Sequence, residues 1–311
     1  MPVIIPETLP ASQFLKDEGI FVINEQRAKT QDIRPLKIAI LNLMPNKIVT
    51  ETQLIRKLSN SIVQVEITLV AIKDHQVKNT AQSHLDSFYD YFDDIKTNYY
   101  DAMIFTGAPI EHLEFTKVSY WEEFINILDW AKTHVFSSLF ICWASQAALW
   151  HFYGIDKYTF AKKLFGVFPH KAEVSNEQLF LGMDNPFYAP HSRHTTSDEA
   201  AIRSHPELTV LASSNEGGIY AVKNTNQRQL FISGHAEYDE NTLFTEYLRD
   251  ADSEQVTLPK NYFINDNPEH GIETKWKSDA SLFFQNWLNY YVYQTTDYIL
   301  KPETFILNRT L

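Results

Sequence analysis

Short apolar segments alternate with amphipathic segments along most of this chain. Three apolar segments are almost unbroken, namely KIAILNLM (37–44), DAMIFTGAP (101–109) and SSLFIC (137–142). Such runs are typical of strands that are buried on both faces, as in a parallel sheet. Further strands are expected at residues 65–72, 208–214, 217–224 and 229–235.

Helices are expected between these strands. Residues 50–53 and 119–122 have the form of capping boxes, and apolar residues follow each on one helical face. Residues 279–294 predict an aromatic-rich last helix. This alternation predicts one doubly wound α/β domain over the whole chain, with a mostly parallel sheet and helices on both faces. We expect an N-terminal extension at 1–34 and an inserted irregular stretch near 155–200.

Composition narrows the classes of function. The net charge of −12 argues against broad nucleic-acid binding, which needs a basic face. A single cysteine leaves no internal disulfide and no multi-cysteine metal site. The N-terminus lacks the pattern of a signal peptide, and no apolar run reaches about 18 residues, so we expect no membrane partner. These features predict a cytoplasmic protein.

The one cysteine stands at a switch between two patterns. Cys142 ends an expected strand, and a helical pattern begins just after it. A thiol at a helix N-terminus meets free N–H groups, which favour the thiolate, and a tight strand-to-helix turn raises the side chain above the sheet. Buried structural cysteines are also common. This stretch alone leaves a nucleophile and a buried apolar residue equally open.

A second strand end carries a histidine and a glutamate. His235 ends the expected strand 229–235, and Glu237 follows in GHAE. In extended backbone the two side chains point to the same side, so Glu237 can orient the imidazole. Gly107 stands at a third strand end. Because ligands bind at the carboxyl ends of strands in such sheets, we expect Cys142, Gly107 and His235 to lie close together.

Other charged residues have both a binding and a structural interpretation. Glu246 and Arg249 lie three positions apart on an expected helix, either as a surface ion pair or as a site for a zwitterionic substrate. Lys47 follows the first expected strand, and we predict that it contacts a phosphate of a ligand. His191 and His194 could bind zinc with His235, but HExxH is absent, so we expect no metal and treat Ser192 and Arg193 as pocket residues.

These residues carry a resemblance. FICWASQ together with GHAE is similar to the Cys…His-x-Glu arrangement of class I glutamine amidotransferases. More specifically, the whole chain resembles the homoserine O-acyltransferase family of the homoserine transsuccinylase type. The matching segments are IRPLKIAILNLMPNKI (33–48), FTGAPIEHLEF (105–115), FICWASQAAL (140–149), APHSRH (189–194), GHAEYD (234–239), PKNYF (259–263) and NWLNYYVYQ (286–294). One departure is Ala236, where the family has proline.

The resemblance implies an acyl-CoA-dependent transferase with a class I glutamine amidotransferase-like, flavodoxin-like fold. Cys142 would carry the acyl group, His235 would act as base and Glu237 as its orienter. Lys163, Ser192 and Arg249 would contact the substrate, as would Glu246 by the argument above. The substrates would be L-homoserine and acetyl-CoA, with no bound cofactor, in methionine biosynthesis.

Two further expectations follow from the chemistry. The backbone N–H of Trp143 and one from Gly107-Ala108 would form the oxyanion hole, and Lys47 would be the phosphate contact to CoA. The family associates position 111 with the choice of acyl donor. Glu111 would repel the carboxylate of a succinyl group, which predicts acetyl transfer.

Several alternatives stay open at this point. The acyl donor could be succinyl-CoA, and the acceptor could be serine, which differs from homoserine by one methylene. A glutamine amidotransferase or cysteine hydrolase would need an ammonia-accepting partner domain. A redox-sensing module would not need Ser145, Gln146 or Glu237. The aromatic segment 286–294 could pack internally or form a homodimer contact.

Overall fold

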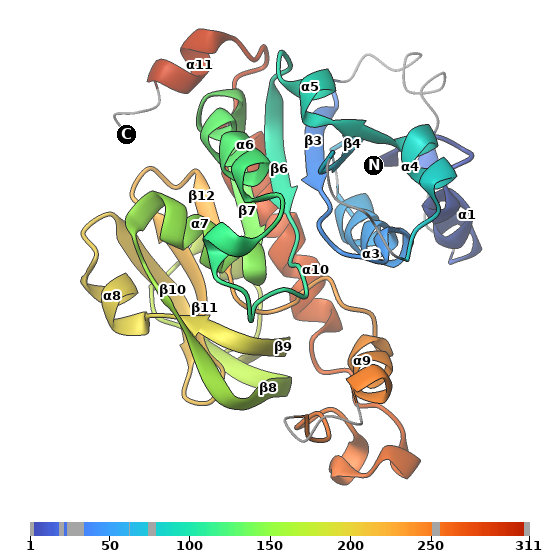
Figure 1. Ribbon diagram of the computed structural model, residues 1–311, viewed down its shortest axis with the longest axis vertical. Coiled ribbons are helices and arrows are strands. Elements are labelled where there is room, and N and C mark those ends of the chain that lie inside the picture. Colours follow the sequence, from blue (N-terminus) through green and yellow to red (C-terminus); the bar gives the residue numbers. More distant parts are fainter. Residues whose placement is uncertain are drawn as a thin grey trace.

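The computed structural model describes residues 3–18, 22–23, 34–61, 63–73, 79–250 and 256–307 (Figure 1). One twisted sheet runs through the molecule in the order β2-β1-β4-β3-β6-β7-β12-β11-β10-β8-β9, and β5 pairs with β4. The parallel strands are β1 (Val3–Ile4), β2 (Val22–Ile23), β3 (Leu36–Leu41), β4 (Val65–Ala71), β5 (Tyr89–Tyr91), β6 (Tyr100–Phe105), β7 (Val135–Ile141) and β12 (Gln229–Ile232). The antiparallel strands are β8 (Lys157–Ala172), β9 (Phe187–Ser197), β10 (Leu208–Ser214) and β11 (Gly218–Asn224).

Helices cover both faces of the parallel part. The longer ones are α1 (Pro10–Asp17), α3 (Lys47–Ser59), α6 (Trp121–His134), α7 (Trp143–Tyr153), α9 (Thr242–Asp250) and α10 (Lys277–Asn286), which continues as the π-helix η5 (Trp287–Tyr293). The shorter ones are α4 (Gln82–Phe88), α5 (Phe92–Ile95), α8 (Glu199–Ser204), α11 (Pro302–Leu307), η1 (Phe115–Lys117), η2 (Gln178–Phe180), η3 (Ile264–Asp266) and η4 (Pro268–His270). Apolar side chains of α3, α10 and η5 form one core with the sheet, and those of α6 and α7 form a second. The predicted doubly wound α/β fold is confirmed.

The expected strands are confirmed, but two helix starts were wrong. Helix α3 begins at Lys47, where the Asn46 side chain accepts a hydrogen bond from the Val49 N–H at 3.5 Å. Thr50 lies inside the helix and its hydroxyl donates to the Asn46 carbonyl, so residues 50–53 are not a capping box. Helix α6 begins at Trp121 rather than after Ser119. In both cases the polar residues that imitate a cap lie within one turn of the true start.

The predicted irregular stretch near 155–200 was also wrong. Strands β8 and β9 pair there over most of their length, from Lys157 opposite Ser197 to His170 opposite Phe187. A register shift between Thr159 and Leu164 and a glycine in β8 interrupt the alternation of apolar and polar residues. Because the sequence signal of a strand is that alternation, the hairpin was hidden from it.

The two terminal segments join the body of the fold. Part of the predicted N-terminal extension belongs to the sheet, because β1 pairs in parallel with β4. At the other end, 286–294 packs inward, and the Trp287 indole donates to the Ser137 hydroxyl at 3.1 Å. The homodimer contact remains a prediction. Within the described residues, each helix is too short or too polar to cross a bilayer.

Candidate active site

Cys142 occupies a sharp turn between β7 and α7. Its φ and ψ are 52° and −113°, a conformation that a side chain with a Cβ rarely adopts. The cysteine N–H donates to the Ile232 carbonyl of β12 at 2.7 Å, which ties the turn to the neighbouring strand. Strain of this kind persists where the surrounding structure fixes it, often at functional sites. The predicted strand-to-helix turn at the thiol is confirmed.

His235 lies beside the thiol, and hydrogen bonds to Pro190 and Glu237 fix its position. Its N–H donates to the Pro190 carbonyl at 2.8 Å, and its ring Nδ1 lies 2.7 Å from Glu237 Oε1. Both side chains are buried. If Nδ1 donates to the carboxylate, Nε2 is the nitrogen left for chemistry. Burial lowers the pKa of His235, but the Glu237 carboxylate and the Cys142 thiol raise that pKa more, to well above its ordinary value. This balance favours the imidazolium form of His235 beside the thiol.

Tyr238 packs against the imidazole of His235. Its ring stacks on His235 with centroids 4.2 Å apart and planes 17° from parallel. The tyrosine hydroxyl donates to Glu246 Oε1 at 2.8 Å, which connects the catalytic turn to α9. Sequence reasoning missed this residue. Its only signal was an aromatic residue three positions after the candidate base.

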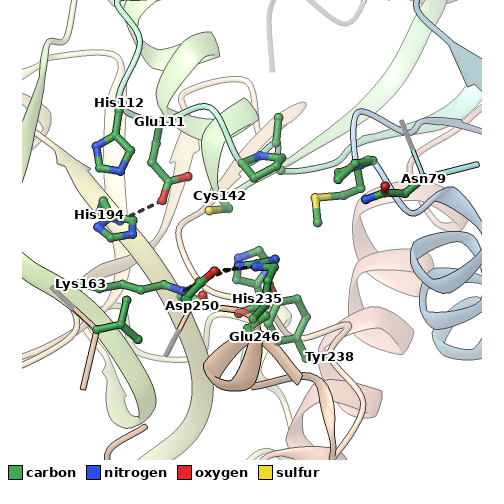
Figure 2. A pocket seen from close by; sticks show the side chains of 18 residues that line it. Asn79, Glu111, His112, Cys142, Lys163, His194, His235, Tyr238, Glu246 and Asp250 are labelled. Atoms are coloured by element: carbon green, nitrogen blue, oxygen red, sulfur yellow. Dashed lines mark hydrogen bonds and ion pairs between the residues drawn. The ribbon is translucent and has the colours of Figure 1, made fainter. Parts of the chain in front are cut away.

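A cavity of about 740 Å³ opens over the thiol (Figure 2). This size suits a substrate-sized ligand. It brings together most of the predicted site residues: Gly107, Ala108, Glu111, Cys142, Lys163, Ser192, His235, Glu246 and Arg249. Glu237 lies behind His235 as its hydrogen-bond partner. The expectation that three strand ends meet at one site is therefore confirmed.

The cations of the pocket share one carboxylate that the sequence did not indicate. Asp250 Oδ2 lies 3.0 Å from Lys163 Nζ. The Arg249 guanidinium donates two hydrogen bonds to the Asp250 carboxylate, of 2.6 and 2.7 Å. These bonds, from Arg249 first and then Lys163, lower the pKa of Asp250 to about 2. Of the two interpretations of Glu246 and Arg249, the surface ion pair is not formed, because Glu246 accepts from Tyr238 and Arg249 bonds to Asp250. The only signal for Asp250 was its place at the end of the expected helix.

Glu111 is fixed on the pocket wall. Its Oε1 accepts a hydrogen bond from the His194 N–H at 3.0 Å, and Lys157 Nζ donates to its backbone carbonyl at 2.6 Å. In Figure 2 the carboxylate lies between His194 and Cys142. Glu111 and Cys142 both line the cavity. The residue expected to select the acyl donor thus presents a carboxylate to the same space as the thiol.

Three backbone N–H groups belong to residues at the two strand ends beside the thiol. Trp143 is the first residue of α7, and Gly107 and Ala108 follow the end of β6. In the described part of the chain, none of these three N–H groups has a protein acceptor. A methyl built on Gly107 would lie 3.8 Å from Cys142 Sγ, so this glycine backbone passes close to the sulfur. The Trp143 ring points into the aromatic core against Phe124 and does not line the pocket.

Lys47 does not reach this pocket. Its ammonium is buried and donates to the Asn42 carbonyl, near Glu51. Burial lowers the pKa of Lys47 to about 8. The predicted contact with CoA was therefore wrong in its geometry, because the lysine follows the strand but folds back under the loop.

The histidines of the zinc alternative are placed apart. His191 Nε2 lies 3.1 Å from His170 Nε2 in the core, whereas His194 lines the pocket and packs on the His112 ring. Within the described ranges, no three metal-ligating side chains converge. His235 instead bonds to Glu237 through Nδ1.

Solved structures with a similar fold are glutamine amidotransferases. One from Thermotoga maritima matches with a TM-score of 0.55 at 12% identity, over 82% of this chain and 98% of its own. Another, from Methylobacillus flagellatus, has a TM-score of 0.51 at 10% identity, over 83% and 95%. These likenesses establish the class I glutamine amidotransferase-like fold.

Closer relatives come from sequence. A protein of Ilyobacter polytropus named homoserine O-acetyltransferase 1 is 52% identical over 97% of this chain and 100% of its own. Proteins of Bacteroides fragilis and Acetivibrio thermocellus, both named homoserine O-acetyltransferase, are each 50% identical over 96% of this chain and 98% and 99% of their own. The family described as homoserine O-succinyltransferase matches residues 2–298. The chain therefore belongs to this family of homoserine O-acyltransferase enzymes.

Proposed function

We propose that this protein is a homoserine O-acetyltransferase, which moves the acetyl group of acetyl-CoA to the hydroxyl of L-homoserine through a thioester on Cys142. The observation that carries the proposal is the Glu111 carboxylate, which lines the same cavity as Cys142 and His235, the latter bonded to Glu237. The triad supplies a nucleophile and a base, and the carboxylate selects among acyl donors. The names of the relatives support the same choice.

In the first half-reaction the thiolate attacks the thioester carbonyl. A bond forms from Cys142 Sγ to the acyl carbon, and the bond to the CoA sulfur breaks. The His235 imidazolium protonates the leaving CoA thiolate, and the raised pKa of His235 ensures that this proton is available. One thioester is exchanged for another, so the step needs no other source of energy. The N–H groups of Trp143 and Gly107-Ala108 would hold the oxyanion.

In the second half-reaction the neutral His235 takes the proton of the homoserine hydroxyl. The oxygen attacks the acyl carbon as Cys142 Sγ leaves, which restores the thiolate and imidazolium. Lys163, Ser192, Glu246 and Arg249 all line the cavity. Arg249 and Lys163 would bind the substrate carboxylate, Ser192 would form a hydrogen bond and Glu246 would bind the ammonium group. Glu246 Oε2 is buried and has no hydrogen-bond partner among the described residues, so an ammonium group would satisfy it.

Glu111 would determine the donor by repulsion. A succinyl group would bring its terminal carboxylate into the same cavity, where two partly desolvated negative charges repel each other. An acetyl group has no such charge. The use of acyl-CoA and of a free thiol suits a reducing cytoplasm, which is the location we propose.

The test is intact-mass measurement after mixing the enzyme with acetyl-CoA or succinyl-CoA at equal concentration. We expect an acetyl adduct that homoserine discharges, and no adduct in Cys142→Ala. Glu111→Gly should gain succinyl transfer, whereas Glu114→Gln, an exposed carboxylate on the same loop, should not. Equal or faster succinyl transfer by the unaltered enzyme would contradict acetyl selectivity and favour the activity in the family's name. Serine is compared with homoserine as acceptor in the same assay.

A further inference from the structure

A buried arginine lies behind the catalytic pair. Arg193 of β9 is 1% exposed, yet within the described residues no carboxylate lies in ion-pair distance of it. Its guanidinium donates to the Thr195 carbonyl at 2.9 Å, the Gly217 carbonyl at 2.7 Å and His191 Nδ1 at 3.3 Å. Removing a charge from water without a counter-ion is strongly unfavourable. A buried cation at this position therefore calls for an explanation.

The position of Arg193 relates it to both reacting groups. A small cavity of about 20 Å³ is lined by Arg193, by Ser145 and Gln146 in the first turn of α7, and by Ser233. Glu199 also lines it, beyond ion-pair distance of the guanidinium, and accepts a hydrogen bond from the Ile219 N–H at 3.2 Å. Ser145 and Gln146 stand three and four residues after Cys142, and Ser233 precedes His235 by two residues. Gln146 also exchanges two hydrogen bonds with Thr195, of 2.8 and 3.2 Å. Arg193 thus shares this small cavity with residues that follow the thiol and a residue that precedes the imidazole.

Arg193 remains charged at neutral pH, and its histidine neighbours remain neutral. Burial lowers the pKa of Arg193 to about 10, and Cys142, Glu199 and Glu111 act against that decrease. Burial also lowers the pKa of His170 to about 3 and that of His191 well below its ordinary value. Because Arg193 Nε–H donates to His191 Nδ1, the proton of His191 is on Nε2. The fixed charge behind the site is therefore that of the guanidinium.

We propose that Arg193 is a positioning residue for the reaction, whose fixed positive charge behind Cys142 favours the thiolate–imidazolium form of the Cys142–His235 pair. Nothing in the transfer requires Arg193 to contact a substrate, and it does not line the large cavity. The inference rests on the proposed role of Cys142 as nucleophile but not on the identity of donor or acceptor.

The test uses alkylation of the thiol. Since Cys142 is the only cysteine, the rate of reaction with iodoacetamide reports on this site alone and requires neither acyl-CoA nor homoserine. The rate is measured from pH 5 to 10 for the unaltered protein, Arg193→Met, Arg193→Lys and Arg228→Met. The other charged or titratable groups facing the thiol are the same in all four: Glu111, His112, Lys163, His194, His235, Glu237, Tyr238, Glu246, Arg249 and Asp250.

Arg228 is a matched control. It is also a buried arginine that donates to two backbone carbonyls, of Phe136 and Val135, both at 2.8 Å. Those residues begin β7, whereas Cys142 follows its other end, so about 20 Å of strand separates them. Arg228→Met should lower the temperature of unfolding and leave the alkylation profile unchanged.

We expect the curve of alkylation rate against pH to shift along the pH axis, and not only to change in its maximal rate. In Arg193→Met the midpoint should rise by about one pH unit, which makes alkylation about tenfold slower on the acidic side of the midpoint. Arg193→Lys should unfold at a lower temperature, because it loses the planar fork of hydrogen bonds, but its profile should stay within about twofold of the unaltered protein.

Three outcomes would overturn the proposal: an unchanged midpoint in Arg193→Met, an equal shift in both Arg193 variants, or an equal shift in Arg228→Met. If Arg193→Met does not fold, Arg193→Lys decides whether the proposal holds. Because lysine keeps the positive charge, the proposal requires the pH profile of alkylation to be preserved in that variant. Failure of acetyl transfer in the unaltered enzyme would overturn the proposed function alone, since alkylation does not depend on it.

Discussion

The reacting centre and the charged rim of the same pocket are built in different ways. Cys142 and His235 follow β7 and β12, which are adjacent parallel strands with a continuous register from Ser138 opposite Gln229 to Ile141 opposite Ile232. The rim cations Lys163 and Arg249 come from β8 and α9, which are joined at the pocket by the side-chain bond between Lys163 and Asp250. Backbone pairing therefore sets the geometry of the centre, and ion pairs set the geometry of the rim.

This difference predicts two kinds of mutational effect. Changes at the centre should alter the rate of bond making with little effect on substrate affinity. Changes at the rim should alter the Michaelis constant of the amino-acid acceptor and leave acylation of the thiol intact. Helix α9 has one fully buried residue among those described, Leu243, so the rim depends on few packing contacts. A change at the rim that slows acylation, or a change at the centre that alters substrate affinity, would contradict this distinction.

The largest effect is expected for Glu237→Gln. The amide keeps the shape of the side chain but removes the charge 2.7 Å from His235 Nδ1 and permits the wrong tautomer. By analogy with other triads, the rate of acylation should fall on the order of 10²- to 10⁴-fold. Rapid-mixing measurement of acetyl-enzyme formation checks this, and an unchanged rate would remove Glu237 from the triad.

The same variant has a pH signature. Glu237 helps to raise the pKa of His235 above its unfolded value, so the pair stabilises the fold fully below about pH 6.5. That contribution is lost as the pH rises through the folded pKa. The difference in unfolding temperature between the unaltered protein and Glu237→Gln should therefore shrink from pH 6 to pH 9. A constant difference would mean that the pair contributes no proton-linked stability.

The same contrast explains how far the sequence could predict this molecule. Unbroken apolar runs revealed the parallel strands, and the rule that strand ends share one edge brought Cys142 and His235 together. Lys47 also follows a strand end, but its ammonium turns back to the Asn42 carbonyl and does not line the pocket. The position of the backbone does not determine where a long side chain points. Asp250 was missed because its partner Lys163 lies 87 positions away in the sequence. Tyr238 was missed because its contacts with His235 and Glu246 follow no periodic pattern.

A smaller effect at the centre is expected for Gly107→Ala. The added methyl would lie 3.3 Å from Cys142 Cβ and 3.6 Å from His235 Cε1, in the space beside the sulfur. Displacement of the acyl group by a fraction of an ångström should slow acylation about 10- to 100-fold. The variant should bind homoserine as before, and full acylation activity would show that the acyl group lies elsewhere.

Gly154→Ala is the matched control. Gly154 ends α7 with φ of 67° and no atom within 4 Å of an added methyl, so the substitution adds backbone strain without steric contact. It should lower stability by about 1 kcal/mol and leave the acylation rate unchanged. Thermal unfolding and rapid mixing on the two glycine variants thus separate a steric effect at the thiol from a general loss of stability.

The smallest effect is expected at the rim, for Asp250→Asn. Asp250 holds Lys163 and Arg249 together, so the amide should leave both cations less well positioned for the acceptor carboxylate. We expect the Michaelis constant of homoserine to rise about 3- to 10-fold, equivalent to about 1 kcal/mol of binding, with the rate of acylation by acetyl-CoA unchanged.

Asp239→Asn is the matched control for Asp250→Asn, because Asp239 pairs with Arg56 outside the pocket and the same charge is removed. It should leave the Michaelis constant of homoserine unchanged. A lower constant in Asp250→Asn would mean that the aspartate competes with the substrate carboxylate for the two cations rather than positioning them. A slower acylation step would mean that the rim also sets the geometry of the thiol, and the division between the two regions would no longer hold.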